Sequence, residues 1–365
     1  MKNTLLSVII PTYNEKENVA EIIDRLENTL KKISFEIIFV DDDSPDGTAE
    51  VIREQTKRKP YISLIHRLGR RGLAGAVIEG ILSSKSEICA VIDCDLQHDE
   101  TKLSEMYSLF EKNPNLDLVV GSRFLNEGDI SPGSFSYVRR LGSNLATFYT
   151  KKLLGIKISD PLSGFFMVKR KSFEQYSKRL QTQGFKVLAD LVASARQNFV
   201  TEEVSYKFKS RFAGESKMTI ATGLELMGLI ISQIFNGNLS IRFILFCFVG
   251  LSGVLIQLLV TGIFMNFSKI SFDIAQTFGI VSAMTTNYFF NNLLTFRDRS
   301  LKYFELLKGL ITFYLICSLG ALANFSLAHF LYSQLSNWLI ASLGGAIFSA
   351  IWNFTLSSMF TWKIR

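Results

Sequence analysis

The stretch Ala90-Val91-Ile92-Asp93-Cys94-Asp95-Leu96-Gln97-His98 joins a short apolar run to two carboxylates that are one residue apart. An apolar, β-branched run of this kind is typical of a buried strand. Asp93 and Asp95 would then follow the end of that strand, and in an open α/β sheet ligands bind at that edge. The pair predicts a site for a hard divalent cation, Mg²⁺ or Mn²⁺, on a nucleotide diphosphate. The plain alternative is a solvated acidic loop.

Apolar residues are distributed unevenly along the 365-residue chain. Residues 1–217 carry most of the charge, whereas residues 239–365 are mostly apolar and contain few carboxylates. This predicts a soluble domain, an amphipathic segment at 218–238 that lies flat at a membrane surface, and a membrane domain. The net charge of +7 comes with no basic arm or zinc-knuckle spacing. We therefore expect anionic lipid and phosphate substrates as partners, and no nucleic acid.

The cysteines and the start of the chain bear on the compartment. Cys89, Cys94, Cys247 and Cys317 form no C-x-x-C motif and no evident disulfide frame, which favours a reducing environment. The first predicted strand begins almost at once, so we expect no cleavable signal peptide.

Strands and helices alternate over the first 123 residues, which predicts a doubly wound parallel sheet. The expected strands are 5–11, 35–40, 62–65, the run before Asp93, and 116–121. Polar loops follow four of them. Four polar loops at one predicted edge indicate a site. The chain has no Gly-x-x-x-x-Gly-Lys, and its first loop has no Gly-x-Gly-x-x-Gly, which argues against a P-loop and a dinucleotide fold.

Six motifs follow one another in the order of a known family. They are Pro11-Thr-Tyr-Asn-Glu15, Val40-Asp-Asp-Asp-Ser-Pro-Asp-Gly-Thr48, Asp93-Cys-Asp-Leu-Gln-His98, Gly121-Ser-Arg123, Asp160-Pro-Leu-Ser-Gly-Phe165 and Arg211-Phe-Ala-Gly-Glu-Ser-Lys217. The chain over residues 5–220 resembles family 2 glycosyltransferases of the GT-A fold, and more closely the polyprenyl-phosphate (dolichol-phosphate) mannose synthases. The resemblance implies a GT-A, Rossmann-like catalytic domain over residues 1–217.

The resemblance also implies roles for individual residues. It places the metal on Asp93, Asp95 and Gln97, and it makes Asp95 and Arg123 the catalytic residues. The implied donor-binding residues are Pro11, Tyr13, Glu15, Val40, Asp42, Asp93, Cys94, Asp95, Arg211 and Lys217. Cys94 departs from the family, which usually has alanine there, and a backbone contact would tolerate this change. The plain alternatives are a solvated basic loop for Arg211 and Lys217, and a helix N-terminal charge for Glu15.

A basic amphipathic segment covers residues 135–154. Its apolar stripe is flanked by lysines and arginines, which favours a helix at a membrane surface as strongly as a core-facing helix with a solvated back. The resemblance implies that Arg123, Arg139 and Ser143 bind the phosphate of a lipid acceptor, and arginine suits phosphate because it forms bidentate contacts. Asp160 and Asp190 are polar candidates to which we assign no role.

Four apolar spans near the C-terminus contain no Asp, Glu, Lys or Arg, at about 243–265, 274–296, 309–331 and 338–362. Each is long enough to cross about 30 Å of hydrocarbon. The segments 287–297 and 353–363 resemble each other at an offset of 66 residues, which predicts two related hairpins and resembles a GtrA-type membrane domain. Basic residues in the 297–308 loop and at the C-terminus predict a multi-pass protein whose catalytic domain is cytoplasmic.

The sequence therefore predicts an inverting glycosyltransferase that moves mannose from GDP-mannose to a polyprenyl or dolichyl phosphate. Two alternatives remain open. One is a glucosyltransferase that uses UDP-glucose, because the strand-end acids do not identify the sugar. The other is a sugar-lipid transporter or flippase in which the membrane domain does the work and the first domain regulates it. The oligomeric state is open, a homo-oligomer included.

Overall fold

The computed structural model describes residues 5–125, 137–182, 184–196, 198–209, 220–267, 272–335 and 338–363. The chain divides into two compact units, Met1–Ile241 and Arg242–Arg365. The elements of the first unit are β1 (Leu6–Thr12), α1 (Val19–Thr29), β2 (Phe35–Asp41), α2 (Thr48–Arg58), β3 (Ile62–His66), α3 (Leu73–Ser83), β4 (Ile88–Val91), α4 (Lys102–Lys112), β5 (Leu118–Ser122), α5 (Tyr137–Leu154), β6 (Phe166–Lys169), α6 (Arg170–Ser177), α7 (Val187–Ala195), β7 (Thr201–Ser205) and α8 (Ile220–Ile234).

The described strands of the first unit form one sheet in the order β3-β2-β1-β4-β6-β5-β7. The neighbours β3, β2, β1 and β4 are parallel to one another, and β5 is parallel to β7. The five strands predicted from residues 1–123 run in one direction, as expected. The prediction did not include β6, which runs antiparallel to both β4 and β5. The chain reverses after the 160–165 segment, and the buried side chains of β6 fill the space between two parallel strands.

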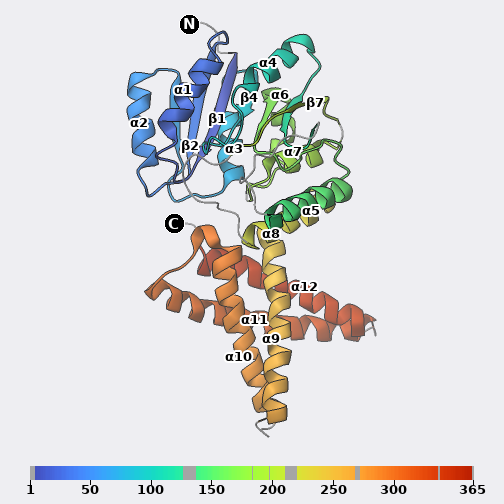
Figure 1. Ribbon diagram of the computed structural model, residues 1–365. Coiled ribbons are helices and arrows are strands. Elements are labelled where there is room, and N and C mark those ends of the chain that lie inside the picture. Colours follow the sequence, from blue (N-terminus) through green and yellow to red (C-terminus); the bar gives the residue numbers. More distant parts are fainter. Residues whose placement is uncertain are drawn as a thin grey trace. The chain divides into compact units, whose positions relative to one another are not determined.

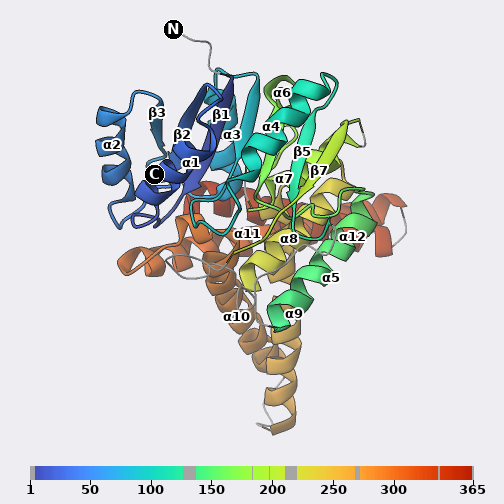
Figure 2. The same cartoon turned by 45° about the horizontal axis from the view of Figure 1, so that its top comes forward.

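Helices cover both faces of this sheet (Figures 1 and 2). Alternate residues of one strand enter opposite layers, so Val8 and Ile10 pack with the layer that contains α1 and α4, whereas Ile9 packs with the layer that contains α3, α6 and α7. A strand buried on both faces has no polar side, which explains the apolar run from Val8 to Pro11 within β1. Both cores leave the strand ends available for polar side chains.

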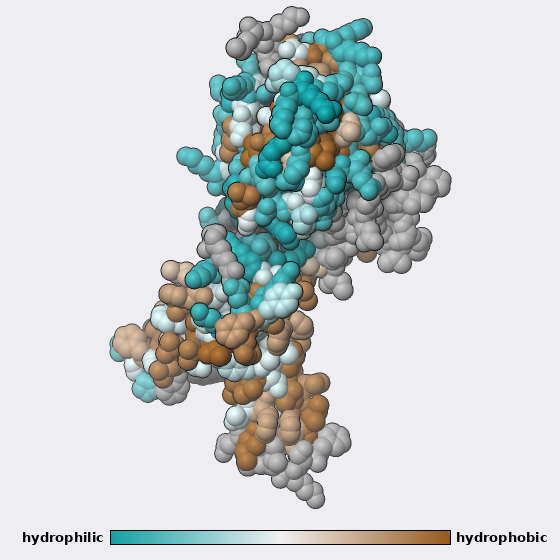
Figure 3. Space-filling model, turned by 90° about the vertical axis from the view of Figure 1, so that its left-hand side faces the viewer, coloured by the Kyte–Doolittle hydropathy of each residue, from teal (hydrophilic) through white to brown (hydrophobic). Residues whose placement is uncertain are grey.

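The second unit is helical in its described residues. Its elements are α9 (Ile241–Phe267), α10 (Phe272–Phe290), a π-helical turn (Asn291–Thr295), a 3₁₀ turn (Arg297–Arg299), α11 (Phe304–Leu335), α12 (Trp338–Leu356) and a second π-helical turn (Ser357–Thr361). Helices thus occupy all four predicted spans, and α11 begins five residues earlier than its predicted span. By length and composition, Ile241–Met265 and Phe304–Ala323 are apolar enough to cross a membrane. The visible face of this unit is largely hydrophobic (Figure 3). Four crossings remain a prediction.

The predicted repeat is confirmed at the ends of α10 and α12. Each helix ends in a π-helical turn, and the two turns start at Asn291 and Ser357, which are 66 residues apart. The amide of Phe296 donates to Asn291 O, and the amide of Trp362 donates to Ser357 O. The rings of Phe296 and Trp362 then stack on each other, with centroids 4.3 Å apart and planes 5° apart. Equivalent residues of the two hairpins therefore meet in this unit's aromatic core.

Candidate functional site

The carboxyl ends of β1, β2, β4 and β5 lie at one edge of the sheet. The first three strands are parallel, and β5 shares their direction because it is antiparallel to β6, as β4 is. The prediction that four polar loops gather at one edge is therefore confirmed. Ligands of open α/β sheets bind at this edge.

Three of these loops each contain a non-glycine residue in the left-handed region. These are Asn14 after β1 (φ 54°), Asp43 after β2 (φ 56°) and Leu96 after β4 (φ 61°). Asn and Asp tolerate this conformation, but leucine adopts it only where its surroundings compel it. Such residues cluster at functional sites, and here they mark the same three loops that the motifs singled out.

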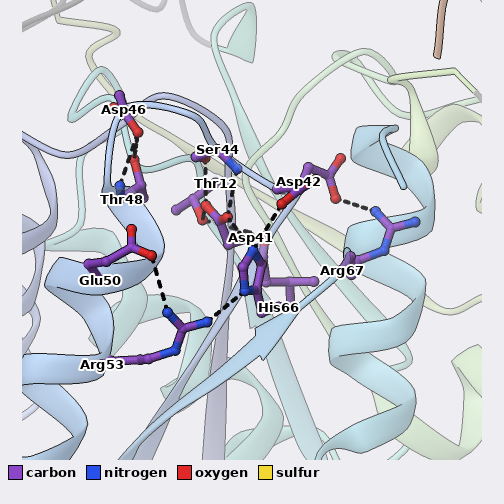
Figure 4. Close-up of polar contacts among 12 residues, drawn as sticks. Thr12, Asp41, Asp42, Ser44, Asp46, Thr48, Glu50, Arg53, His66 and Arg67 are labelled. Carbon is purple, nitrogen blue, oxygen red and sulfur yellow. Dashed lines mark hydrogen bonds and ion pairs between the residues drawn. The ribbon is translucent and has the colours of Figure 1, made fainter. Parts of the chain in front are cut away.

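Asp41 ties the β1 loop to the β2 loop. Its buried carboxylate accepts hydrogen bonds from Thr12 Oγ1 (3.0 Å), Ser44 N (2.9 Å) and Ser44 Oγ (2.6 Å) (Figure 4). A second link joins the same loops, because Glu15 N donates to Thr48 Oγ1 at 3.0 Å. Sequence reasoning assigned no role to Asp41, since the acids of Asp41-Asp42-Asp43 look equivalent until the fold buries one of them.

Asp42 is held from inside the protein by Arg67 and by the backbone of Gly72. Its Oδ1 pairs with Arg67 Nη1 (Figure 4), and its Oδ2 accepts a hydrogen bond from the Gly72 amide at 2.6 Å. Burial raises the pKa of Asp42, whereas the charge of Arg67 and the Gly72 amide oppose that rise. Arg67 is itself buried and also lies 3.2 Å from Glu79. Arg67 is a residue that the sequence analysis missed, because nothing in the sequence links it to Asp42.

The remaining predicted donor residues lie on the same two strands. Pro11 and Val40 are paired neighbours in the sheet register, and both are buried. Tyr13 is half-buried in the β1 loop, and the guanidinium of Arg71 lies 4.7 Å from the centre of its ring. Glu15 Oε2 accepts Asn18 Nδ2 at 2.7 Å. The fold thus brings these predicted residues to one corner of the sheet edge.

The three predicted metal ligands follow β4 in one tight turn. The side chain of Asp93 is 35% exposed, and its Oδ2 lies 3.1 Å from His98 Nε2. Asp95 is buried, and its Oδ1 accepts the amide of Gln97 at 3.2 Å. The Gln97 side chain is also anchored, since its Nε2 donates to Lys209 O at 3.1 Å. Cys94 is buried in the core between the two carboxylates.

Within the described residues, no three His, Cys, Asp or Glu side chains form a metal-binding cluster. The predicted metal site, Asp93, Asp95 and Gln97, offers two carboxylates and one amide. That donor set fits a hard cation such as Mg²⁺ or Mn²⁺, which commonly takes one or two carboxylates from the protein and completes its shell with water and substrate phosphates.

Arg123 and Asp160 form a buried ion pair at the end of β5. Arg123 donates from Nε at 2.7 Å and from Nη2 at 2.9 Å to the two carboxylate oxygens of Asp160. Burial alone would lower the pKa of Arg123, but the hydrogen bonds and charge of Asp160 raise it above its ordinary value. The guanidinium also lies 5.5 Å from the ring centres of Phe124 and Phe208.

The other predicted site residues are placed less fully. The backbone of Arg139 belongs to α5, and Ser143 is half-buried on the same helix. Arg211 and Lys217 lie outside the described residues. On α5, Leu145, Phe148 and Leu153 each expose about half of their surface, so these three residues of the predicted apolar stripe are not buried in a core.

Two family models match the chain. Residues 7–177 match "Glycosyl transferase family 2", and residues 245–362 match "GtrA/DPMS, transmembrane domain". The dolichol-phosphate mannosyltransferase of Pyrococcus furiosus is 31% identical over 362 residues, which cover 98% of this chain and 99% of that protein. The chain belongs to the dolichol-phosphate mannosyltransferase family. It is a glycosyltransferase with a GT-A domain and a GtrA-like membrane domain.

Two further relatives are named dolichol-phosphate mannosyltransferase and match a little over half of the chain. The Saccharomyces cerevisiae protein is 32% identical over 223 residues, which cover 58% of this chain and 80% of the yeast protein. The Mycosarcoma maydis protein is 31% identical over 219 residues, covering 58% and 73%. Among solved structures, a Mycobacterium tuberculosis glucosyl-3-phosphoglycerate synthase in complex with Mn²⁺, UDP-glucose and phosphoglyceric acid has a TM-score of 0.47 and 16% identity, and the match covers 63% of this chain and 80% of that one.

Proposed function

We propose that this enzyme transfers mannose from GDP-mannose to a polyprenyl or dolichyl phosphate with inversion at the anomeric carbon. The full-length similarity to a dolichol-phosphate mannosyltransferase supports this reaction. The proposal depends mainly on the position of Asp93 and Asp95, which follow the end of β4. In the sheet, β1 and β2 with their donor loops lie on one side of β4, and β5, which ends beside Arg123, lies on the other side. Donor, metal and acceptor groups would thus share one edge.

The donor would bind at the corner formed by β1 and β2. Pro11, Tyr13, Glu15, Val40 and Asp42 would hold the guanosine, and Cys94 would contribute its backbone. Arg211 and Lys217 would bind the diphosphate. Cationic groups suit this position because the leaving diphosphate gains negative charge as the glycosidic bond breaks.

Asp93, Asp95 and Gln97 would hold Mg²⁺ or Mn²⁺ on the donor diphosphate. When bound, the cation neutralises the charge that develops on the leaving group. The two aspartates supply anionic oxygens. Gln97 supplies a neutral one, and its anchoring to Lys209 O limits how far it can move.

The acceptor phosphate would attack directly. One of its oxygens forms the new bond to the anomeric carbon, the bond from that carbon to the diphosphate oxygen breaks, and the electron pair leaves with GDP. Because the nucleophile is already an oxyanion, the step requires no general base. Arg123, Arg139 and Ser143 would hold this phosphate.

The acceptor's isoprenoid tail requires the reaction to take place at the membrane surface, since each CH₂ group that leaves the bilayer costs about 0.8 kcal/mol. We propose three parts of the chain: a catalytic domain over 1–217, an interfacial segment over 218–238 and a four-span domain over 239–365. The 297–308 loop and the catalytic domain would be cytoplasmic. Within the first unit α5 packs beside α8, and both carry exposed apolar side chains, which suits two helices that lie on one lipid surface.

The metal role is tested with Asp95→Ala. We expect it to abolish transfer of labelled mannose from GDP-mannose to lipid extract, and excess EDTA should do the same to the unmodified enzyme. Full activity in either case would rule out the metal site. A competition assay with GDP-mannose and UDP-glucose tests the donor, and exclusive use of UDP-glucose would overturn that assignment.

A variant that ends after Ile241 tests whether chemistry belongs to the first unit. The end point matters, because Gln181 Nε2 donates to Gly237 O at 3.1 Å and Ile241 packs against α8 at Gly228. We expect this variant to use short, soluble acceptors and to lose long acceptors embedded in vesicles. If it folds but is inactive, while residues 242–365 alone move sugar-lipid between leaflets, the flippase alternative is correct.

A further inference from the structure

His98 bridges two parts of the first unit. It follows β4 in the motif that contains Asp93 and Asp95, and Tyr206 follows β7, 108 residues later. One ring nitrogen of His98, Nδ1, lies 2.7 Å from the Tyr206 hydroxyl, and the other, Nε2, lies 3.1 Å from Asp93 Oδ2. His98 and Tyr206 are buried, with 4% and 3% of their surfaces exposed, whereas the side chain of Asp93 is 35% exposed.

The partners of His98 determine which atoms donate. An ionised carboxylate only accepts hydrogen bonds, so His98 Nε2 carries a hydrogen atom and donates a hydrogen bond to Asp93 Oδ2. In a neutral ring Nδ1 is then an acceptor, and the Tyr206 hydroxyl donates to it. Burial raises the pKa of Tyr206, so this hydroxyl keeps its proton at neutral pH. Ser163 faces the same hydroxyl.

The surroundings leave His98 little freedom to turn. The rings of Phe165, Tyr206 and Phe208 have centroids between 5.5 and 5.6 Å from that of His98. Gly164 leaves room for the carboxylate, because a methyl group there would lie 2.7 Å from Asp93 Oδ2. Two residues of the Asp160–Phe165 motif therefore hold this arrangement: the ring of Phe165 packs against His98, and Gly164 leaves space for Asp93. The same motif contributes Asp160 to the ion pair with Arg123.

We propose that His98 and Tyr206 are positioning residues that hold the Asp93 carboxylate in one orientation for the divalent cation. This inference rests on the proposed function, which assigns Asp93 to the metal. Hydrogen-bond partners of this kind set the orientation of a ligand and tune its affinity. In this chain of hydrogen bonds, Tyr206 and His98 are buried, whereas the Asp93 carboxylate is accessible to solvent and could reach a cation.

The test measures Mn²⁺ binding to the full-length enzyme in detergent with GDP present, by the electron paramagnetic resonance signal of free Mn²⁺. His98→Gln and His98→Asn form the decisive pair. Both remove the ring, but the glutamine amide nitrogen can occupy the place of Nε2 and still donate to Asp93, whereas the shorter asparagine cannot reach it. We expect His98→Asn to raise the dissociation constant of Mn²⁺ about 10- to 100-fold and His98→Gln to raise it much less.

Tyr206→Phe removes only the hydroxyl, and we expect it to weaken Mn²⁺ binding about fivefold, as the loss of one hydrogen bond would. Its matched control is Tyr176→Phe, another buried tyrosine, whose hydroxyl accepts Asn198 Nδ2 at 3.4 Å and which should leave Mn²⁺ binding unchanged. The thermal unfolding of every variant is measured beside that of the unmodified enzyme, to verify that each variant is folded.

The outcomes separate the two proposals. Equal Mn²⁺ binding by His98→Asn, His98→Gln and the unmodified enzyme, or equal losses in Tyr206→Phe and Tyr176→Phe, would overturn the positioning role alone. If the unmodified enzyme binds no Mn²⁺ in the presence of GDP, the metal assignment of Asp93 fails, and the positioning role fails with it.

Discussion

Asp160 engages Arg123 through both carboxylate oxygens, at 2.7 and 2.9 Å, and it also accepts the Arg123 backbone amide at 3.2 Å. Both side chains are buried. A phosphate that binds Arg123 would therefore meet a guanidinium whose orientation is already set. This relationship assigns a role to Asp160, for which the sequence offered none, and it affects how variants of Arg123 must be interpreted.

Arg123→Ala should raise the KM for polyprenyl phosphate much more than the KM for GDP-mannose, because one substrate loses a phosphate contact. The same variant leaves Asp160 buried without its partner, which costs on the order of 3–5 kcal/mol of stability. The double variant Arg123→Ala/Asp160→Asn removes that charge and should regain stability while keeping the high acceptor KM. Steady-state kinetics with each substrate varied in turn checks this. A raised donor KM with an unchanged acceptor KM would assign Arg123 to the nucleotide.

Arg67→Met should weaken GDP binding about 10- to 100-fold, since Asp42 would lose a charge-assisted hydrogen bond. Burial raises the pKa of Asp42, and Arg67 opposes that rise. Without Arg67 the carboxylate would protonate at higher pH, so GDP binding should weaken further as the pH falls. Calorimetric titration with GDP across pH measures both effects. Arg70→Met is the control, because Arg70 pairs with Glu79 at the surface; equal losses in both variants would contradict a specific role of Arg67.

Asp190 should make the stability of the first unit depend on pH. Burial raises its pKa to about 6 from 3.8, so the folded state holds the proton more tightly than the unfolded chain. The free energy of unfolding should then fall as the pH rises from about 4 to about 6, by on the order of 3 kcal/mol.

Asp190→Asn should flatten this part of the stability profile. Asp190 accepts Gln181 N at 2.6 Å and the side chain of Gln233 on α8, and it lines a small cavity with Lys186 and Glu225. Because those two residues are present in both proteins, the difference between the profiles reports the substitution of Asp190. Thermal unfolding at a series of pH values measures it. Identical profiles would show that Asp190 titrates normally.

Gly320→Ala should separate α11 from α12 and destabilise the second unit by about 1–3 kcal/mol, because the added methyl group would overlap Oδ1 of Asn353. Adding Asn353→Ala should recover part of the loss, which a double-mutant cycle on thermal unfolding in detergent would detect. Gly262→Ala is the control, since a methyl group there meets nothing within 4 Å. Equal effects of the two glycine variants would contradict a close contact at Gly320.

Much of the fold follows from local patterns. The alternation of strands and helices, a helix over Tyr137–Leu154 within the predicted segment and the repeat between 287–297 and 353–363 are all present. The direction of β6 was not predictable, because a strand as short as Phe166–Lys169 shows the same sequence pattern whether it pairs with its neighbours in parallel or antiparallel. Only its pairing with β4 and β5 distinguishes the two.

The sequence by itself determined which polar residues follow the strand ends, since a buried strand must place its polar residues where it leaves the core. Only the tertiary structure decided which aspartates are buried and hydrogen-bonded inside the protein and which remain accessible to solvent. Asp41 and Asp42 are adjacent in the chain, yet Asp41 joins two loops and Asp42 pairs with Arg67. His98 and Tyr206 are 108 residues apart and meet in one core. Hydrogen bonds and burial depend on distance in space, and a linear pattern records distance only along the chain.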